Sequence, residues 1–140
     1  ESLRMVIELL ADIYPDKDVV TVFGCGGEKS RTKRPLMGKV ASESSKKIYI
    51  TNDNPRRESP LNIFEDIVSG TTKRNYVTEM YRKSALSMAI KENPNSVILL
   101  AGKGAENYTI DLMGTTFLGK DSDTLKDVCK ELNFKMEKIQ

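Results

Sequence analysis

Apolar residues follow two different spacings along the chain. Near the N-terminus they recur every three or four residues, which predicts a helix over residues 2–14. Three short runs are instead almost continuously apolar and predict buried strands. These runs cover residues 19–23, 47–51 and 97–101. The last run, VILLA, is apolar on both faces, as expected for a central strand of a parallel sheet.

Helices are expected between and after these strands. Pro35 suits the first turn of one helix, and Ser59 followed by Pro60 suits the N-cap and the first residue of another. Helical spacing and capping residues indicate further helices along the chain. The predicted helices after Pro35 are 60–68, 78–91 and 121–132. This alternation predicts an α/β, Rossmann-like fold whose mostly parallel sheet is flanked by helices on both faces.

The size and charge of the chain exclude several classes of protein. Its 140 residues suit one compact domain. The 22 basic and 20 acidic residues are too evenly balanced for a nucleic-acid or membrane surface. No apolar run approaches the roughly 20 residues that span a bilayer, and the charges inside the N-terminal pattern argue against a signal peptide. We therefore expect a cytoplasmic protein.

Few residues in the chain have the chemistry of a catalytic or metal site. Histidine is absent, which removes the commonest general base and the usual catalytic triads. The two cysteines, Cys25 and Cys129, fit reduced thiols better than a disulfide or a zinc site, so no metal site is expected. Any chemistry must be carried by another kind of group or by another domain.

Three loops follow the carboxyl ends of predicted strands, where α/β sheets bind ligands. The first, GCGGEKSRTKRP, has glycines that permit close approach of the backbone to a ligand. It matches neither the Walker A pattern nor the G-x-G-x-x-G fingerprint. Its basic residues suit a phosphate or carboxylate, although a tight turn with a solvated basic surface is the alternative. These basic residues are Lys29, Arg31, Lys33 and Arg34.

The second and third loops carry paired charges. In TNDNPRRESP, Asp53 can pair with an ammonium group and Arg56 can hold a carboxylate through two parallel hydrogen bonds, which suits a zwitterion. An internal Asp53–Arg56 pair that only shapes the loop is the alternative. In LLAGKGAENY, N–H groups around Gly102 and Gly104 can meet an anion, and Glu106 can receive an ammonium group. A tight turn with a surface acid is the alternative there.

Three segments taken together resemble the C-terminal domain of the Mur ligases, and most closely that of the UDP-N-acetylmuramoyl-tripeptide synthetases. In chain order these segments are VFGCGGEKSRTKRPLMGKVA, ITNDNPRRESP and ILLAGKGAENY. The resemblance covers nearly the whole chain, so residues 1–140 are expected to form one domain of a three-domain enzyme. It implies an ATP-dependent ligase that joins meso-diaminopimelate, or a close dicarboxylic diamino acid such as lanthionine, to UDP-MurNAc-L-Ala-D-Glu in peptidoglycan synthesis. It also implies a monomer in which the central domain binds most of the ATP and Mg²⁺. The C-terminal domain alone is then expected to be inactive, with no catalytic residue of its own.

Carried over by position, the resemblance also assigns individual residues. The residues of the diamino-acid pocket would be Lys29, Asp53, Asn54, Pro55, Arg56, Gly102 and Glu106. The residues on the nucleotide side would be Glu28, Lys33 and Arg34. Lys29 stands where diaminopimelate-adding members usually have arginine, and Ala105 stands where many have histidine. The choice between diaminopimelate and lanthionine therefore stays open.

Two other functions are compatible with parts of the sequence. A Rossmann-type nucleotide-binding module is suggested by GCGG after a strand and is disfavoured by the incomplete fingerprint; binding of NAD would support it. A non-catalytic α/β scaffold, in which the loops are only turns, predicts that Arg56 has no role in selecting an amino acid.

Overall fold

A computed structural model describes residues 2–27, 30–53 and 55–101, together with the backbone of four short strands beyond them. The helices are α1 (Ser2–Ile13), α2 (Lys33–Ser44), α3 (Pro60–Val68) and α4 (Arg82–Glu92). The first four strands are β1 (Asp18–Phe23), β2 (Lys47–Ile50), β3 (Tyr76–Thr78) and β4 (Ser96–Leu100). The later strands are β5 (Tyr108–Thr109), β6 (Asp111–Leu112), β7 (Thr115–Gly119) and β8 (Glu137–Lys138).

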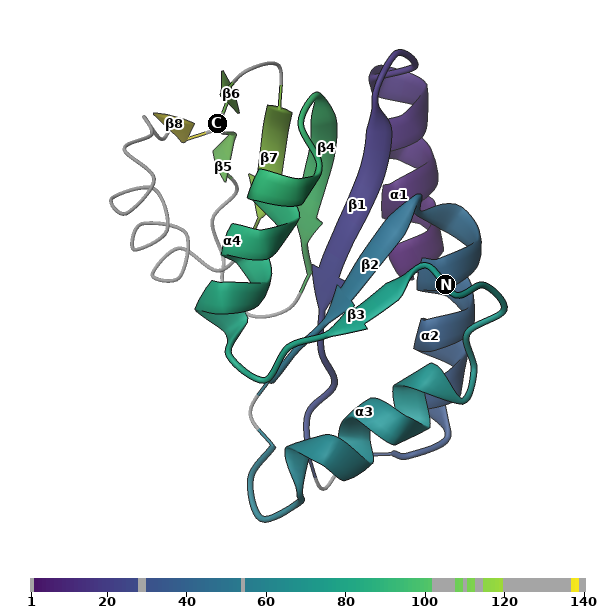
Figure 1. The fold of residues 1–140 in the computed structure, drawn as a ribbon. Helices are drawn as coiled ribbons and strands as arrows, with labels where there is room; N and C mark the ends of the chain where they lie inside the picture. The colour runs from purple at the N-terminus through teal and green to yellow at the C-terminus, as the bar shows by residue number, and fades with distance from the viewer. Residues whose placement is uncertain are drawn as a thin grey trace.

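The strands form one eight-stranded sheet with the order β3-β2-β1-β4-β7-β5-β8, in which β6 pairs with β7 (Figure 1). The strands from β3 to β7 in this order are parallel, whereas β5, β6 and β8 pair antiparallel. From β1 the chain proceeds outward to β2 and β3, and then returns to place β4 on the other side of β1. The order therefore reverses beside β1, and in open α/β sheets such a reversal opens a crevice for ligands at the carboxyl ends of the strands.

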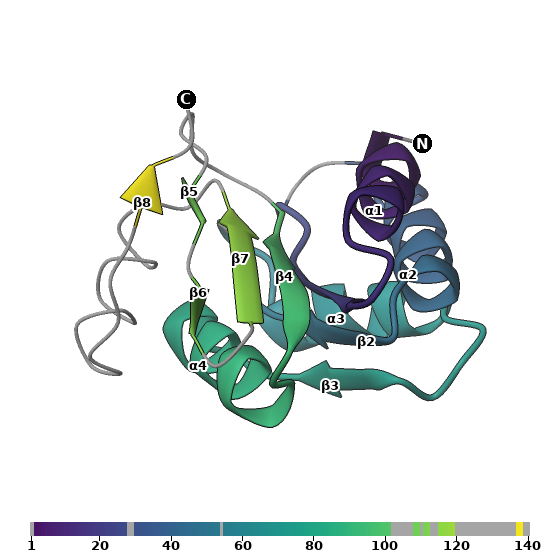
Figure 2. The same ribbon diagram turned by 90° about the horizontal axis from the view of Figure 1, so that it is seen from above.

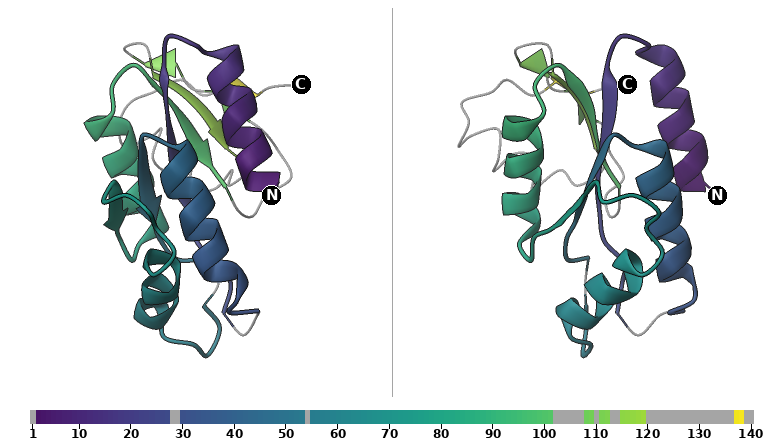
Figure 3. Two further views of the ribbon diagram at one scale, coloured as in Figure 1. Left: turned by 90° about the vertical axis from the view of Figure 1, so that its right-hand side faces the viewer. Right: turned by 45° about the vertical axis from the view of Figure 1, so that its right-hand side comes forward.

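Helices cover both faces of the sheet, because residues of the buried strands alternate between the two faces. On one face, Val20 and Val22 pack with Ile98 and Leu100 under α4. On the other face, α1 packs over β1 and β4, while α2 and α3 pack over β1 and β2. Figure 2 shows the sheet between these helices from above, and Figure 3 shows α4 opposite α1 and α2. The predicted Rossmann-like architecture is confirmed.

Most of the predicted elements that fall on described residues are present. The first helix, the three apolar strands and the helix that follows Ser59 lie within one or two residues of their predicted bounds. The prediction for 78–91 was wrong at its start, because α4 begins at Arg82 and the short strand β3 precedes it. Met80, assigned to that helix, lies before it. The helix predicted at 121–132 lies outside the described residues.

Candidate functional site

A pocket of about 290 Å³ lies at the carboxyl end of β1, where the strand order reverses. Its lining comes from the loop after β1, the start of α2, and the residues that follow β2 and β4. The lining residues are Phe23, Gly24, Cys25, Gly26, Ser30, Lys33, Arg34, Met37, Asp53 and Ala101. Lys33 is exposed and Asp53 is half-buried, so the pocket offers a cation and a carboxylate beside apolar side chains. Such a lining suits a ligand that carries both signs of charge.

The loops after β1 and β2 press against each other at two glycines. A side-chain Cβ at Gly24 would lie 2.1 Å from the carbonyl oxygen of Thr51, and one at Gly27 would lie 1.7 Å from the carbonyl oxygen of Pro55. Only glycine permits backbones to approach this closely. The glycine cluster therefore has a packing role that its incomplete nucleotide fingerprint did not reveal. It brings the first, basic loop (residues 24–34) beside the second loop (residues 52–59), which is called the DNPR loop after its sequence motif.

Arg56 is exposed and connects the same two loops. Its Nη1 donates a hydrogen bond of 2.9 Å to the carbonyl oxygen of Gly27, and its backbone has a φ of 54°. Positive φ is uncommon outside glycine and costs about 1 kcal/mol or more, so surrounding contacts must hold it. Among the described residues, Asp53 and Arg56 form no ion pair with each other. The internal pair that was the alternative for this loop is therefore absent from the described part of the chain.

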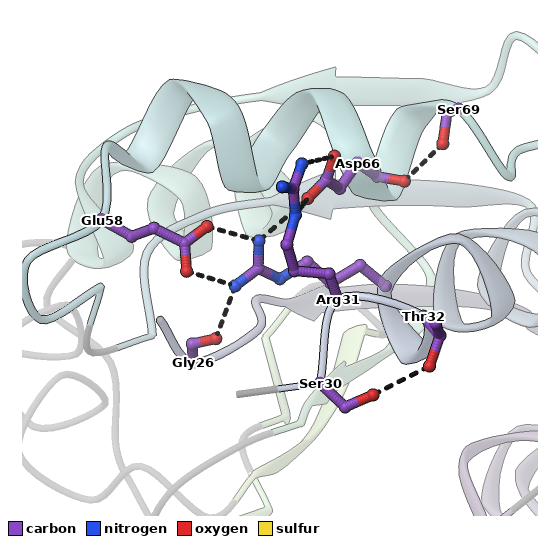
Figure 4. A network of polar contacts seen from close by, with 8 residues as sticks. Gly26, Ser30, Arg31, Thr32, Glu58, Asp66 and Ser69 are labelled. Carbon is purple, nitrogen blue, oxygen red and sulfur yellow. Dashed lines mark hydrogen bonds and ion pairs between the residues drawn. The ribbon is translucent and has the colours of Figure 1, made fainter. Parts of the chain in front are cut away.

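Arg34 lies at the centre of a partly buried polar network that joins the two loops to α3. Figure 4 labels its partners Gly26, Glu58 and Asp66. Arg34 is 1% exposed. Its Nη1 and Nη2 donate to the Glu58 carboxylate at 2.6 and 2.8 Å, Nη1 donates to Asp66 at 2.9 Å, and Nη2 donates to the Gly26 carbonyl at 3.2 Å. These contacts raise the pKa of Arg34 above its usual range, chiefly through the hydrogen bonds to Glu58. The described contacts of Arg34 are thus internal to the domain.

Asp66 is shared by two arginines of the first loop and α2. Arg31 donates to it through Nε at 3.1 Å and Nη2 at 3.2 Å, in addition to the bond from Arg34. The hydrogen bond from Arg31 is the main cause that lowers the pKa of Asp66 below its usual 3.8, and the hydrogen bond from Arg34 lowers it further. Two members of the basic cluster therefore find acidic partners inside the domain, whereas Lys33 is exposed at the pocket.

Cys25 lies on the apolar side of the pocket. Its Sγ is 3.4 Å from the Sδ of Met37, and burial raises the pKa of the thiol to about 11. A thiol with a raised pKa is protonated at neutral pH and is a poor nucleophile. Cys25 therefore contributes packing to the pocket, and the expectation that it is a reduced thiol fits this environment.

Arg82 was missed by the sequence analysis. It is the first residue of α4, and its Nη1 donates to the carbonyl oxygen of Asn52 at 3.2 Å while its Nη2 donates to that of Ala101 at 3.0 Å. A cation at the N-terminus of a helix opposes the helix dipole. This feature alone does not identify Arg82, because Lys33 at the start of α2 has it too and is exposed.

The structure brings together part of the predicted site. Asp53, Lys33 and Arg34 line one pocket, and Pro55 and Arg56 contact the first loop at Gly27. Arg56 is not among the described residues that line the pocket. The remaining predicted residues lie outside the described part of the chain, as does Ala105. They are Glu28, Lys29, Asn54, Gly102 and Glu106.

No helix among the described residues is both long enough and apolar enough to cross a bilayer. No three acidic, cysteine or histidine side chains within the same residues are grouped so that they could hold a metal ion.

The chain is similar in sequence and in fold to parts of known ligases. Residues 1–104 match the family described as Mur ligase, glutamate ligase domain. The UDP-N-acetylmuramoyl-L-alanyl-D-glutamate--2,6-diaminopimelate ligase of Clostridium tetani is 40% identical over 94% of this chain and 27% of its own length. Its counterpart of the same name in Solibacter usitatus is 43% identical over 79% of this chain and 23% of its own length. A solved structure of a ligase of this name superposes with a TM-score of 0.74 at 29% identity, over 95% of this chain and 28% of that one.

Proposed function

The chain belongs to the Mur ligase, glutamate ligase domain family, and from this premise we propose that it is the C-terminal domain of a three-domain, ATP-dependent ligase. The chain spans about a quarter of the length of the curated relatives it matches, so the activity is proposed for a longer protein of which this chain is one domain. The proposed reaction joins meso-diaminopimelate, or a close dicarboxylic diamino acid such as lanthionine, to UDP-MurNAc-L-Ala-D-Glu. We propose that the protein acts as a monomer in cytoplasmic peptidoglycan synthesis.

The observation that carries the amino-acid specificity is the placement of the charges in the DNPR loop. Asp53 lines the pocket, and Arg56 is exposed and fixed beside the first loop by one of its five N–H donors. Diaminopimelate has two ammonium and two carboxylate groups, and its distal carboxylate is the group that lysine lacks. The free donors of a guanidinium can hold such a carboxylate with parallel hydrogen bonds. We assign that role to Arg56 and the recognition of an ammonium group to Asp53.

The other pocket residues complete the proposal by position. Lys29 would offer a point charge to a substrate carboxylate, without the fork of a guanidinium. Asn54 and Pro55 belong to the same motif as Asp53 and Arg56, and Gly102 and Glu106 would supply the remaining contacts to the diamino acid. Lanthionine presents the same charges as diaminopimelate at a similar length, so both fit this set of groups.

The nucleotide side is proposed for Glu28, Lys33 and Arg34. The exposed ammonium group of Lys33 lies near Ser30 and the glycine backbone of the pocket, a donor set that suits a phosphate oxygen. Arg34 would act through the loop that it holds at Gly26. Mg²⁺ is placed in the central domain, together with most of the ATP site. In the proposed reaction a phosphoryl group moves from ATP to the D-glutamate carboxylate, and the amine nitrogen then displaces phosphate to form the amide.

A ligation assay on the full-length protein tests this proposal. The protein is supplied with ATP, Mg²⁺, UDP-MurNAc-L-Ala-D-Glu and equal amounts of diaminopimelate, lanthionine and L-lysine, and the products are separated by mass. We expect a tripeptide product that contains a dicarboxylic amine, with ADP released only when both the dipeptide and an amine are present. Preferred incorporation of lysine, or no product at all, would overturn the proposal. The 140-residue chain alone is expected to leave ATP unchanged.

A further inference from the structure

The guanidinium of Arg82 bridges two loops that come from opposite sides of β1. Its Nη1 and Nη2 reach the carbonyl oxygens of Asn52 and Ala101, which follow β2 and β4. These two strands flank β1 in the sheet. Because one planar group holds both carbonyls, the distance between the two chain segments is set by the geometry of the guanidinium.

Both carbonyls lie just beyond the last regular hydrogen bonds of the sheet. Thr51 N–H donates to Phe23 and Ala101 N–H donates to Val22, each at 2.9 Å. Beyond these bonds the two segments line the pocket through Asp53 and Ala101, and the carbonyls of Asn52 and Ala101 accept from a side chain. Arg82 supplies this donor from the start of α4, which covers one face of the sheet.

The bridged positions adjoin the proposed amino-acid pocket in the sequence. Asn52 directly precedes Asp53, and Ala101 directly precedes Gly102 in the Gly-Lys-Gly segment. An arginine at the first position of α4 opposes the helix dipole, so the two carbonyl contacts must outweigh that cost. The hydrogen bonds of Arg82 thus stabilise the two chain segments after β2 and β4 rather than the start of α4.

We propose that Arg82 is a positioning residue for the amine substrate: it sets the spacing between the chain segments that follow β2 and β4, at Asn52 and Ala101, without touching the substrate itself. This inference rests on the proposed ligase function and identifies a further residue on which the same pocket depends. Loss of the bridge would let the two loops separate, which displaces Asp53 and Arg56 from the amine while leaving the ATP site in the central domain unchanged.

The test uses the full-length ligase with Arg82→Gln, Arg82→Lys and, as the matched control, Arg74→Gln at an exposed position before β3. For each protein, kcat and KM are measured separately for the diamino acid, for ATP and for the UDP-linked dipeptide, and Tm is recorded. We expect Arg82→Gln to raise KM for the diamino acid roughly 10- to 100-fold, the scale of a small misplacement of substrate-holding groups. KM for ATP should change less than about two-fold. Arg82→Lys should recover part of the loss, since an ammonium group can reach one carbonyl at a time.

Each outcome has a distinct meaning. Equal increases of all three KM values together with a lowered Tm would overturn the inference and leave Arg82 as a general stabilising residue. Unchanged kinetics in Arg82→Gln would overturn it as well, with the proposed function intact. No ligation by the wild-type protein would instead overturn the proposed function, and the inference with it.

Discussion

Arg34 and Glu58 form a two-point ion pair inside the domain. Nη1 of the guanidinium donates to Oε2 of the carboxylate at 2.6 Å, and Nη2 donates to Oε1 at 2.8 Å. The arginine is 1% exposed, and the Glu58 side chain is 24% exposed. The same guanidinium reaches Asp66 on α3 and Gly26 in the first loop. One side chain therefore fixes the basic loop, the end of the DNPR loop and α3 relative to one another.

Replacing Arg34 by leucine should destabilise the domain strongly. The change leaves Glu58, Asp66 and the Gly26 carbonyl without their shared donor. Removal of one partner from a buried ion pair costs about 3–5 kcal/mol, and we expect about 3 kcal/mol because the two carboxylates keep some contact with water. Urea denaturation of this chain measures the loss. Arg31→Leu is the control, because Arg31 also bonds Asp66 but is 69% exposed; an equal loss in both variants would contradict the assigned role.

The stability of the domain should fall as the pH drops below about 5, partly through Asp66. Its pKa in the folded state lies below the ordinary 3.8, so its stabilising contribution is complete above about pH 5 and is lost progressively as the carboxylate is protonated at lower pH. Asp66→Asn should be less stable than the wild type at pH 7, and the difference should shrink towards pH 3. Urea denaturation at several pH values gives this profile. Glu65→Gln, at the exposed neighbouring position, serves as the control, and a constant difference between Asp66→Asn and wild type would refute the prediction.

Gly27→Ala should separate the two loops at the pocket. The added Cβ would lie 1.7 Å from the Pro55 carbonyl oxygen, which is backbone and cannot rotate away. Overpacking of this kind costs about 1–3 kcal/mol, and it should also break the bond from Arg56 to Gly27. In the full-length ligase we expect a lowered Tm and a raised KM for the diamino acid. Thr32→Ala, at an exposed position of the same loop outside the pocket lining, should change neither, and a wild-type KM in Gly27→Ala would show that the junction is unimportant.

Periodicity predicted the architecture well, because the buried strands and amphipathic helices carry their hydrophobic pattern locally. Val97 to Leu100 could be assigned to a central strand from composition alone, and all four are buried there. The short strand β3 escaped prediction because its three residues, YVT, are only partly buried and gain their place by pairing with β2. Its formation depends on tertiary contacts that no local pattern encodes.

The site was predictable in part. Glycines, DNPR and the basic cluster marked loops that meet at the pocket, because these segments are unusual in composition. The sequence did not reveal which cations are paired inside the domain. Arg34 and Lys33 are neighbours of the same charge, yet Arg34 is buried with Glu58 and Lys33 is exposed. Partners 24 and 32 residues away along the chain decide this difference.

The most direct test of the central claim compares wild type with Arg56→Ala in the full-length ligase, with kcat/KM measured for diaminopimelate and for L-lysine. Loss of one partner from a desolvated, hydrogen-bonded charge pair costs on the order of 2–5 kcal/mol, which is roughly 30- to several-thousand-fold. We expect a loss of that size for diaminopimelate and almost none for lysine, which has no distal carboxylate to lose. Arg56→Lys should recover only part of the activity with diaminopimelate, because an ammonium group lacks the planar fork. Equal losses with both amines would contradict the account and would assign Arg56 to shaping the loop through Gly27.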